Sequence, residues 1–184
     1  MPSQTRVRRL HACAEHEIEA LSNVLIDCVA GGASVSFMAP MSREKAVAYW
    51  RDVAQSAARA ERVVLAAEDT DGAIIGTVQL VLALPENQPH RGEIAKMLVH
   101  RRARRQGVGA ALLIAAEQQA RAAGRTLLVL DTASGDAERL YARHGWQRCG
   151  VIPDYALFPD GRPCATTIFF KSLKVSESRR PAVA

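Results

Sequence analysis

Residues 93–124 read EIAKMLVHRRARRQGVGAALLIAAEQQARAAG and predict a strand, a glycine-containing loop and a helix in that order. The apolar run around Ile94 and Leu98 suits a strand, and the small and aliphatic residues after Gly109 suit a helix that ends at Gly124. The first amides of a helix have no intrahelical partner, and the helix dipole favours negative charge at that end. The segment therefore predicts an anion site, most simply for a phosphorylated ligand.

The loop before the helix adds two features that suit a phosphate group. Gly107 and Gly109 keep side chains away from backbone that approaches a ligand. Arg104 and Arg105 add guanidinium donors whose planar geometry fits phosphate oxygens. The common nucleotide loops do not fit, because no Gly-Lys-Ser/Thr is present and Leu112 occupies the third glycine position of the dinucleotide pattern. The pattern that remains is Arg104-x-x-Gly107-x-Gly109.

The composition of the 184-residue chain is that of one globular domain with its own core. The formal net charge is +5, but Lys and Arg are spread along the chain and only 5% of residues are aromatic, which argues against a nucleic-acid partner. The widely spaced cysteines form no metal-ligand pattern, so we expect no metal and a reduced, cytoplasmic setting. No apolar run is long enough to span a membrane, so we expect no membrane partner.

Periodicity along the chain predicts about seven strands and about four helices. Strands are expected at 6–10, 62–68, 73–84, the segment that begins with Glu93, 126–131, 146–152 and 166–172; helices are expected at 14–28, 42–60, the segment that ends at 123, and 136–143. The order βααβββαβαββ predicts an α+β fold with a mixed sheet. We expect residues 1–174 to form a single domain and residues 175–184 to form a flexible tail.

Two motifs together resemble the GNAT acetyltransferase superfamily. One is Arg104-x-x-Gly107-x-Gly109, and the other is Ala137-x-x-Leu140-Tyr141-x-x-x-Gly145-Trp146, which follows the predicted fifth strand. The resemblance implies an α/β/α fold with a centrally splayed sheet, acetyl-CoA as the cosubstrate, and loop amides that hold its pyrophosphate. Ser134 stands where many members have an asparagine, and its hydroxyl can still form a hydrogen bond. The residues that the resemblance assigns to acetyl-CoA are Met97, Leu98, Val99, Arg104, Arg105, Gln106, Gly107, Val108, Gly109, Ala110, Ser134 and Tyr141.

Acetyl transfer to an amine needs a base for the ammonium, a donor to the thioester carbonyl and an acid for the thiolate. Glu93 and Asp131 are the candidate bases, because adjacent parallel strands would direct both carboxylates into one cleft. The alternative for each is a surface or loop-capping acid. Backbone N–H groups around Leu98 and Val99 are the candidate donors. The resemblance assigns the acid role to Tyr141, and the alternative is a core aromatic residue.

The apolar loop between the first two helices is the candidate wall of the acceptor pocket, and the alternative is a loop packed on the core. Candidate substrate-binding residues are Ser34, Val35, Phe37 and Trp50. Residues 31–39, with 96–99, 130–132 and 159–162, resemble the tabtoxin-resistance branch of the superfamily, which acetylates the amine of a β-lactam amino-acid toxin. In that branch the counterparts of Glu93 and Asp131 are the proposed bases.

The expected function is therefore acetyl-CoA-dependent N-acetylation of a small-molecule amine, by direct transfer in a ternary complex. A β-lactam amino-acid toxin is a candidate acceptor, which would make the protein a toxin-resistance enzyme. Two alternatives stay open. One is acetylation of a protein N-terminus or lysine, which needs an open peptide groove, and the other is a non-catalytic sensor that binds acyl-CoA. The sequence also leaves open whether the protein is a monomer or a homodimer.

Overall fold

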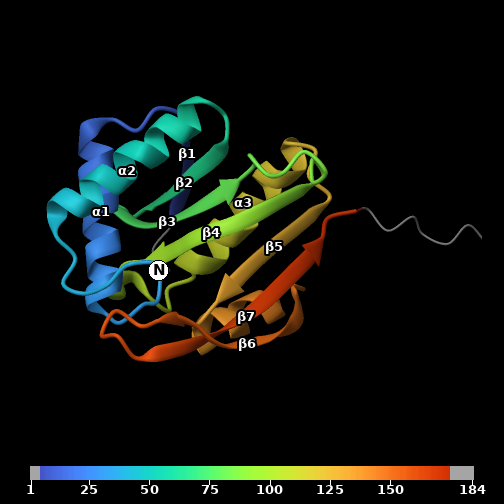
Figure 1. The fold of residues 1–184 in the computed structure, drawn as a ribbon. Coiled ribbons are helices and arrows are strands. Elements are labelled where there is room, and N and C mark those ends of the chain that lie inside the picture. The colour runs from blue at the N-terminus through green and yellow to red at the C-terminus, as the bar shows by residue number, and fades with distance from the viewer. Residues whose placement is uncertain (1–4, 175–184) are drawn as a thin grey trace, which may run out of the picture.

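The computed structural model describes residues 5–174 and contains a seven-stranded sheet in the order β1-β2-β3-β4-β5-β7-β6 (Figure 1). The order βααβββαβαββ and the mixed sheet are as the sequence predicts. The predicted tail at 175–184 lies outside the described residues. The elements are β1 (Arg6–Leu10), α1 (Glu15–Ala30), α2 (Arg43–Ala58), β2 (Arg62–Glu68), β3 (Ile74–Val81), β4 (Arg91–Val99), the 3-10 helix η1 (Arg101–Ala103), α3 (Val108–Ala122), β5 (Leu127–Thr132), α4 (Gly135–Arg143), β6 (Gln147–Leu157) and β7 (Pro163–Ser172).

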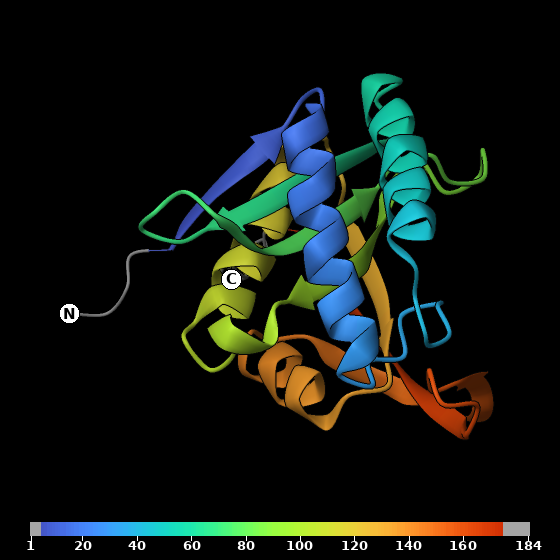
Figure 2. The same cartoon turned by 90° about the vertical axis from the view of Figure 1, so that its left-hand side faces the viewer.

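Helices cover both faces of the sheet, so the molecule has two hydrophobic cores. Figure 2 shows α1 and α2 next to each other in front of the sheet. On β2, Val63 and Leu65 pack toward α3 and α4, whereas Val64 and Ala66 pack toward α1 and α2. Because successive residues of a strand point to opposite faces, a strand covered on both faces reads as a continuous apolar run.

The last two strands are longer than the sequence predicts. β6 continues to Leu157 instead of ending at 152, and β7 begins at Pro163 instead of 166. β6 lies at the edge of the sheet, and its pairing with β7 shifts register between Arg148 and Gly150 and again after Ile152. Such bulges break the alternation of side chains that makes a strand recognisable in a sequence.

The sheet opens between β4 and β5, the only parallel neighbours among the strands of residues 5–174. Their pairing runs from Arg91 to Glu93 and stops there, although β4 continues to Val99. The pairing of β4 with β3 is also irregular, because Thr77 pairs with Leu98 and Gln79 pairs with Ala95. The two residues of β4 between Ala95 and Leu98 therefore form a bulge. The splayed centre that the sequence predicts thus lies beside the second half of β4.

Candidate active site

The loop before α3 has the geometry of an anion site. Gly107 is the N-cap residue of α3, and its φ of +83° is a left-handed conformation that favours glycine. Among the described residues no side chain caps the helix, and nothing beyond the adjacent residues lies within 4 Å of the position that a Cβ of Gly107 would occupy. The first amides of α3 are therefore not covered by a capping side chain.

Gly109 has a different role from Gly107. A Cβ at Gly109 would lie 3.2 Å from Cδ2 of Leu140, a residue of α4. Glycine at this position allows the first turn of α3 to pack closely against α4. The second glycine of the motif therefore brings together the two helices that carry the anion loop and Tyr141.

Two arginines of the basic cluster are paired with carboxylates. Arg101 donates through Nε to Oδ1 of Asp27 at 2.9 Å. Arg102 donates through Nη2 to Oδ2 of Asp69 at 3.1 Å. These ion pairs join the loop to α1 and to the β2–β3 turn, so both arginines have a structural role.

The other two arginines keep their charge available for a ligand. Within residues 5–174, no carboxylate lies within 4.0 Å of the guanidinium of Arg104 or Arg105. Arg104 donates through Nε to the carbonyl oxygen of Val99 at 3.3 Å, which holds its guanidinium beside the end of β4. Arg105 is exposed and has a φ of +61°. Among the described residues, the structure thus separates two arginines that are paired with carboxylates from two that are not.

Strand alternation identifies the amide that faces the gap beside β4. The His100 N–H donates to the carbonyl oxygen of Ile75 at 2.9 Å. Since hydrogen-bonded and non-bonded pairs alternate in an antiparallel ladder, the polar groups of Leu98 point to β3 and those of Val99 point the other way. The Val99 amide is therefore the donor that faces the gap, whereas the sequence named Leu98 and Val99 together.

Glu93 and Asp131 come together, as the sequence predicts. Both line a cavity of about 170 Å³, together with Val129, Leu130, Tyr155 and Ile168. The Glu93 side chain is 42% exposed, and its Oε2 lies 3.5 Å from Nη1 of Arg91. Asp131 accepts a hydrogen bond from the Thr166 hydroxyl at 2.9 Å. Within residues 5–174, neither carboxylate forms a buried ion pair. Both are therefore accessible to a ligand in the cavity.

Tyr141 is a core residue whose hydroxyl is affected by the charge of Asp131. Its side chain is 3% exposed, and its ring centroid lies 5.8 Å from those of Trp146 and Phe169. Burial, and then the negative charge of Asp131, raise the pKa of its hydroxyl above the usual value. The phenol therefore stays protonated in neutral solution, as a general acid must. Ser134, by contrast, caps α4 by accepting from the Ala137 N–H at 3.5 Å.

The loop between α1 and α2 is fastened to the β6–β7 hairpin. Ser34 donates through Oγ to the carbonyl oxygen of Leu157 at 2.9 Å and accepts from Sγ of Cys164 at 3.3 Å. The Ala39 N–H donates to the carbonyl oxygen of Pro159 at 3.0 Å. These contacts hold the loop between α1 and α2 against the end of β6, the turn after it and the start of β7.

The expectation for Trp50 has to be corrected, because the structure places this side chain in the core. It is 0% exposed and lies on the face of α2 that also carries Val47 and Val53. The neighbouring residue Tyr49 lies where the acceptor wall was expected, because its ring contacts that of Phe37 at a centroid distance of 5.1 Å. Val35 is half-buried against the same core.

The sequence predicts no role for three further side chains that border the cavity or the loop between α1 and α2. These are Tyr49, Lys96 and Tyr155, of which only Lys96 lies in a segment that carries the family resemblance. A lysine inside the apolar run from Ile94 to Val99 is a signal that could have been used. Tyr155 lies within the irregular interval of β6 between Ile152 and Ala156, and no local pattern indicates which face it occupies.

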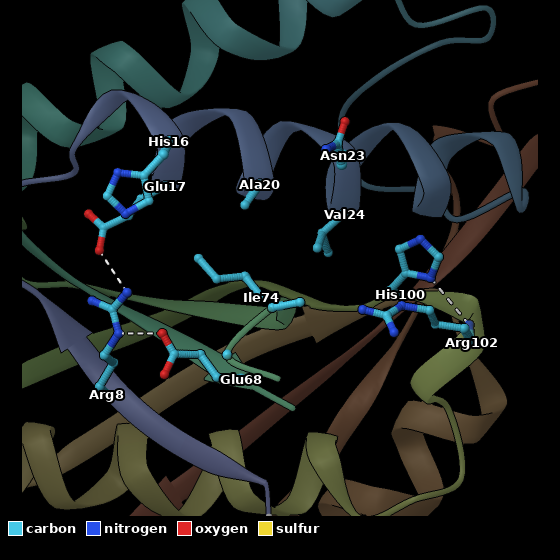
Figure 3. A pocket seen from close by; sticks show the side chains of 12 residues that line it. Arg8, His16, Glu17, Ala20, Asn23, Val24, Glu68, Ile74, His100 and Arg102 are labelled. Carbon is cyan, nitrogen blue, oxygen red and sulfur yellow. Dashed lines mark hydrogen bonds and ion pairs between the residues drawn. The ribbon is translucent and has the colours of Figure 1, made fainter. Parts of the chain in front are cut away.

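A larger cavity, of about 450 Å³, lies elsewhere, between α1 and the β1–β3 edge of the sheet (Figure 3). At its left end in this view, Arg8 donates to Glu17 at 2.7 Å and to Glu68 at 2.6 Å. At the other end, Arg102 is paired with Asp69. Its principal cations are thus paired with acids, and it contains none of the candidate catalytic residues. The smaller cavity is therefore the candidate active site.

No three His, Cys, Asp or Glu side chains within residues 5–174 are grouped closely enough to hold a metal ion. No helix in this part of the chain combines the length and the apolar character that crossing a bilayer requires.

Sequence comparisons point to one family. The family model described as "Acetyltransferase (GNAT) family" matches residues 25–146. A protein of Azospirillum brasilense, described as an uncharacterized N-acetyltransferase, is 31% identical over 127 residues, which are 68% of this chain and 73% of that protein.

Solved structures resemble the fold over nearly its whole length. A ribosomal-protein-alanine N-acetyltransferase from Brucella melitensis has a TM-score of 0.77 at 22% identity and covers 91% of this chain and 99% of its own. A GNAT superfamily phosphinothricin acetyltransferase from Sinorhizobium meliloti, in complex with acetyl-CoA, has a TM-score of 0.75 at 17% identity and covers 98% of this chain and 97% of its own. At sequence identities of 22% and 17%, the similarity to these two structures shows a shared fold only.

Proposed function

Because the chain belongs to the GNAT acetyltransferase family and is an acetyl-CoA-dependent N-acetyltransferase, we propose that it acetylates the amine of a small molecule by direct transfer in a ternary complex. The observation that carries the proposal is the shared position of Glu93 and Asp131 in one cavity of about 170 Å³ beside the open centre of the sheet. A cavity of this size suits a compact acceptor better than a peptide.

The residues around the loop fit the pyrophosphate of acetyl-CoA. The first amides of α3 carry no side-chain cap, the space over Gly107 is open, and two arginines have no carboxylate partner in the described chain. When bound, acetyl-CoA supplies an activated acetyl thioester. We assign its pyrophosphate to the amides of residues 107–110, with Arg104, Arg105 and Gln106 beside them, and its acyl end to the edge of β4 at 97–99.

The proposed mechanism uses one group of the chain for each chemical need. Glu93 or Asp131 removes the proton from the acceptor's ammonium, directly or through water. The Val99 N–H donates a hydrogen bond to the carbonyl oxygen of the acetyl group, because it faces the gap beside β4. Tyr141, whose hydroxyl is protonated at neutral pH, gives its proton to the departing sulfur.

For the acceptor we propose a small amino-acid-like amine, with the β-lactam toxin of the tabtoxin-resistance branch as a candidate. The support is the contact between segments that carry the resemblance. Residues 31–39 and 159–162 are joined by the hydrogen bond from Ala39 to Pro159, and Ser36 of the first segment accepts from Lys96 at 2.9 Å. Phosphinothricin is a second candidate, because one fold relative is named for it.

An acceptor screen tests the proposal. Thiol release from acetyl-CoA is measured with amino acids, polyamines, phosphinothricin, the β-lactam toxin and peptides with free N-termini. We expect release that depends on a small amine. Release with peptides alone would favour the protein acetyltransferase, a possibility raised by one fold relative. Tight acetyl-CoA binding without release from any acceptor would favour the sensor.

We also propose a cytoplasmic location, because Cys13, Cys28, Cys149 and Cys164 are all free thiols. Cell fractionation with an antibody against the protein tests this location. Recovery in the medium, with oxidised cysteines, would contradict it.

A further inference from the structure

The bulge in β4 directs the basic side chain of Lys96 toward the loop between α1 and α2, the candidate wall of the acceptor pocket. Lys96 has a φ of +49°, an uncommon conformation for a residue with a side chain, and it lies in the interval of β4 where the pairing with β3 shifts. Its Nζ donates to the Ser36 hydroxyl at 2.9 Å. Ser36 belongs to the loop between α1 and α2, so the ammonium lies between the sheet and the loop.

The Lys96 ammonium has no anionic partner in the described chain. Within residues 5–174, no carboxylate oxygen lies within 4.0 Å of its Nζ, and its hydrogen-bond partner Ser36 is neutral. Burial lowers the pKa of the ammonium, whereas the charges of Asp131 and Glu93 raise it, so both carboxylates act on it from a distance. An ammonium that is half-buried without a counterion is costly unless a ligand supplies an anion.

A second cation reinforces the positive character of this region. Arg62 contributes to the electrostatic environment of Lys96, and its Nη1 donates to the Gln79 side chain at 2.7 Å. Gln79 in turn donates to the Tyr49 hydroxyl at 2.9 Å. No carboxylate of the described residues lies within 4.0 Å of Arg62. Two cations without ion-pair partners among the described residues thus affect one another, Lys96 beside the loop between α1 and α2 and Arg62 beside α2.

We infer that Lys96 binds a carboxylate of the acceptor and thereby selects amino acids over simple amines and polyamines. This inference rests on the proposed function and specifies its substrate class. The acceptor's ammonium lies at Glu93 and Asp131, and its carboxylate lies at Lys96, so the two ends of one zwitterion meet charges of opposite sign. A polyamine would bring a second cation to Lys96 and would be repelled.

Matched acceptors provide the first test. Amino acids acetylated in the screen are compared with their carboxamides, which keep the amine and lose the negative charge. The wild-type enzyme should prefer the acid, and Lys96→Met should lower kcat/KM for the acid roughly 10- to 100-fold while leaving the carboxamide nearly unchanged. Lys96→Arg should retain most of the preference, and the exposed Lys174→Met is the matched control. The inference is overturned if Lys96→Met still prefers the acid to the carboxamide. It is also overturned if the wild-type enzyme shows no such preference.

A second readout is independent of turnover. The Nζ resonance of Lys96, identified by its loss in Lys96→Met, is titrated by NMR in the coenzyme A complex. A panel of N-acetyl amino acids should raise the pKa of Lys96, because a bound carboxylate favours the ammonium, whereas the corresponding N-acetyl carboxamides should not. If no member of the panel moves it, the inference is wrong even when an acceptor is found. If no amine releases thiol, the proposed function fails, and this titration still decides the role of Lys96.

Discussion

Glu93 and Asp131 lie on the same face of the two parallel strands, one at the last paired position and the other just beyond it. Glu93 pairs with Val129, and Asp131 is two residues further along β5, which is about 6–7 Å along the strand. Since β4 and β5 separate after this pair, both carboxylates border the opening in the sheet and line one cavity. The register of β4 and β5 therefore explains how Glu93, near the start of β4, and Asp131, near the end of β5, form one site.

The first prediction distinguishes the roles of the two carboxylates. Glu93→Gln and Asp131→Asn each remove a base while keeping the size of the side chain. The variant that loses the dominant base should show a turnover about 10²- to 10⁴-fold lower and a flattened ascending limb of the pH–rate profile. Acetyl-CoA affinity, measured by calorimetry, should change little. Wild-type profiles in both variants would exclude the two carboxylates as bases.

Tyr141→Phe should lower turnover by about 10²- to 10⁴-fold, because it removes the proton donor to the leaving sulfur. The phenylalanine ring keeps the contacts with Trp146 and Phe169, so the melting temperature and the acetyl-CoA dissociation constant should stay close to those of the wild type. Steady-state kinetics and calorimetry on the same preparation check this. An unchanged turnover would leave Tyr141 with a core role alone.

The same residue predicts how stability depends on pH. The pKa of Tyr141 is raised in the folded state from its ordinary value of 10.0, by burial and by Asp131. The folded state therefore holds this proton more tightly than the unfolded state, so the contribution to stability is complete below about pH 10 and is lost as the pH rises further. Urea unfolding below and above this pH should show the decline, and Tyr141→Phe should make it shallower. Equal slopes in the two proteins would contradict the assignment.

The arginine cluster should divide into two functional pairs. Arg104→Ala and Arg105→Ala should each raise the KM for acetyl-CoA by roughly 10- to 100-fold, because each removes a charged donor to phosphate. They should also weaken the dependence of that KM on ionic strength. Arg102→Ala is the matched control, since its guanidinium is paired with Asp69 at 3.1 Å. If Arg102→Ala and Arg104→Ala raised the KM for acetyl-CoA equally, the ion pair of Arg102 with Asp69 would not distinguish a structural arginine from a cofactor-binding one.

Gly107→Ala tests the anion loop against a matched glycine. Gly107 and Gly72 have φ values of +83° and +78°, and neither has a heavy atom within 4 Å of its Cβ position. Alanine at either site should therefore cost a similar amount of stability, about 1–2 kcal/mol. Only the change at Gly107 should raise the KM for acetyl-CoA, because Gly72 lies in the β2–β3 turn. A comparable rise in Gly72→Ala would indicate a general effect of lost stability.

Local patterns in the sequence determined most elements of this protein and its cofactor loop. The helix α3, which begins after Gly107 and ends shortly before Gly124, follows from side chains and backbone preferences within a few residues of each end. The common cleft of Glu93 and Asp131 was also predictable, because parallel neighbouring strands bring such positions together. The pattern that grouped Trp50 with Val47 and Val53 already indicated burial, and the pocket role assigned to Trp50 conflicted with it.

Only the tertiary structure decided which charges are free and where the bulges lie. Arg101 and Arg102 are neutralised by Asp27 and Asp69, which are distant in sequence, so no local pattern separates them from Arg104 and Arg105. The direction of Lys96 depends on a register shift between β3 and β4, and its contact with Ser36 joins residues sixty positions apart. The periodicity of apolar residues in the sequence indicates which face of a helix or strand is buried. Ion pairing and strand register depend instead on partners that only the folded chain brings together.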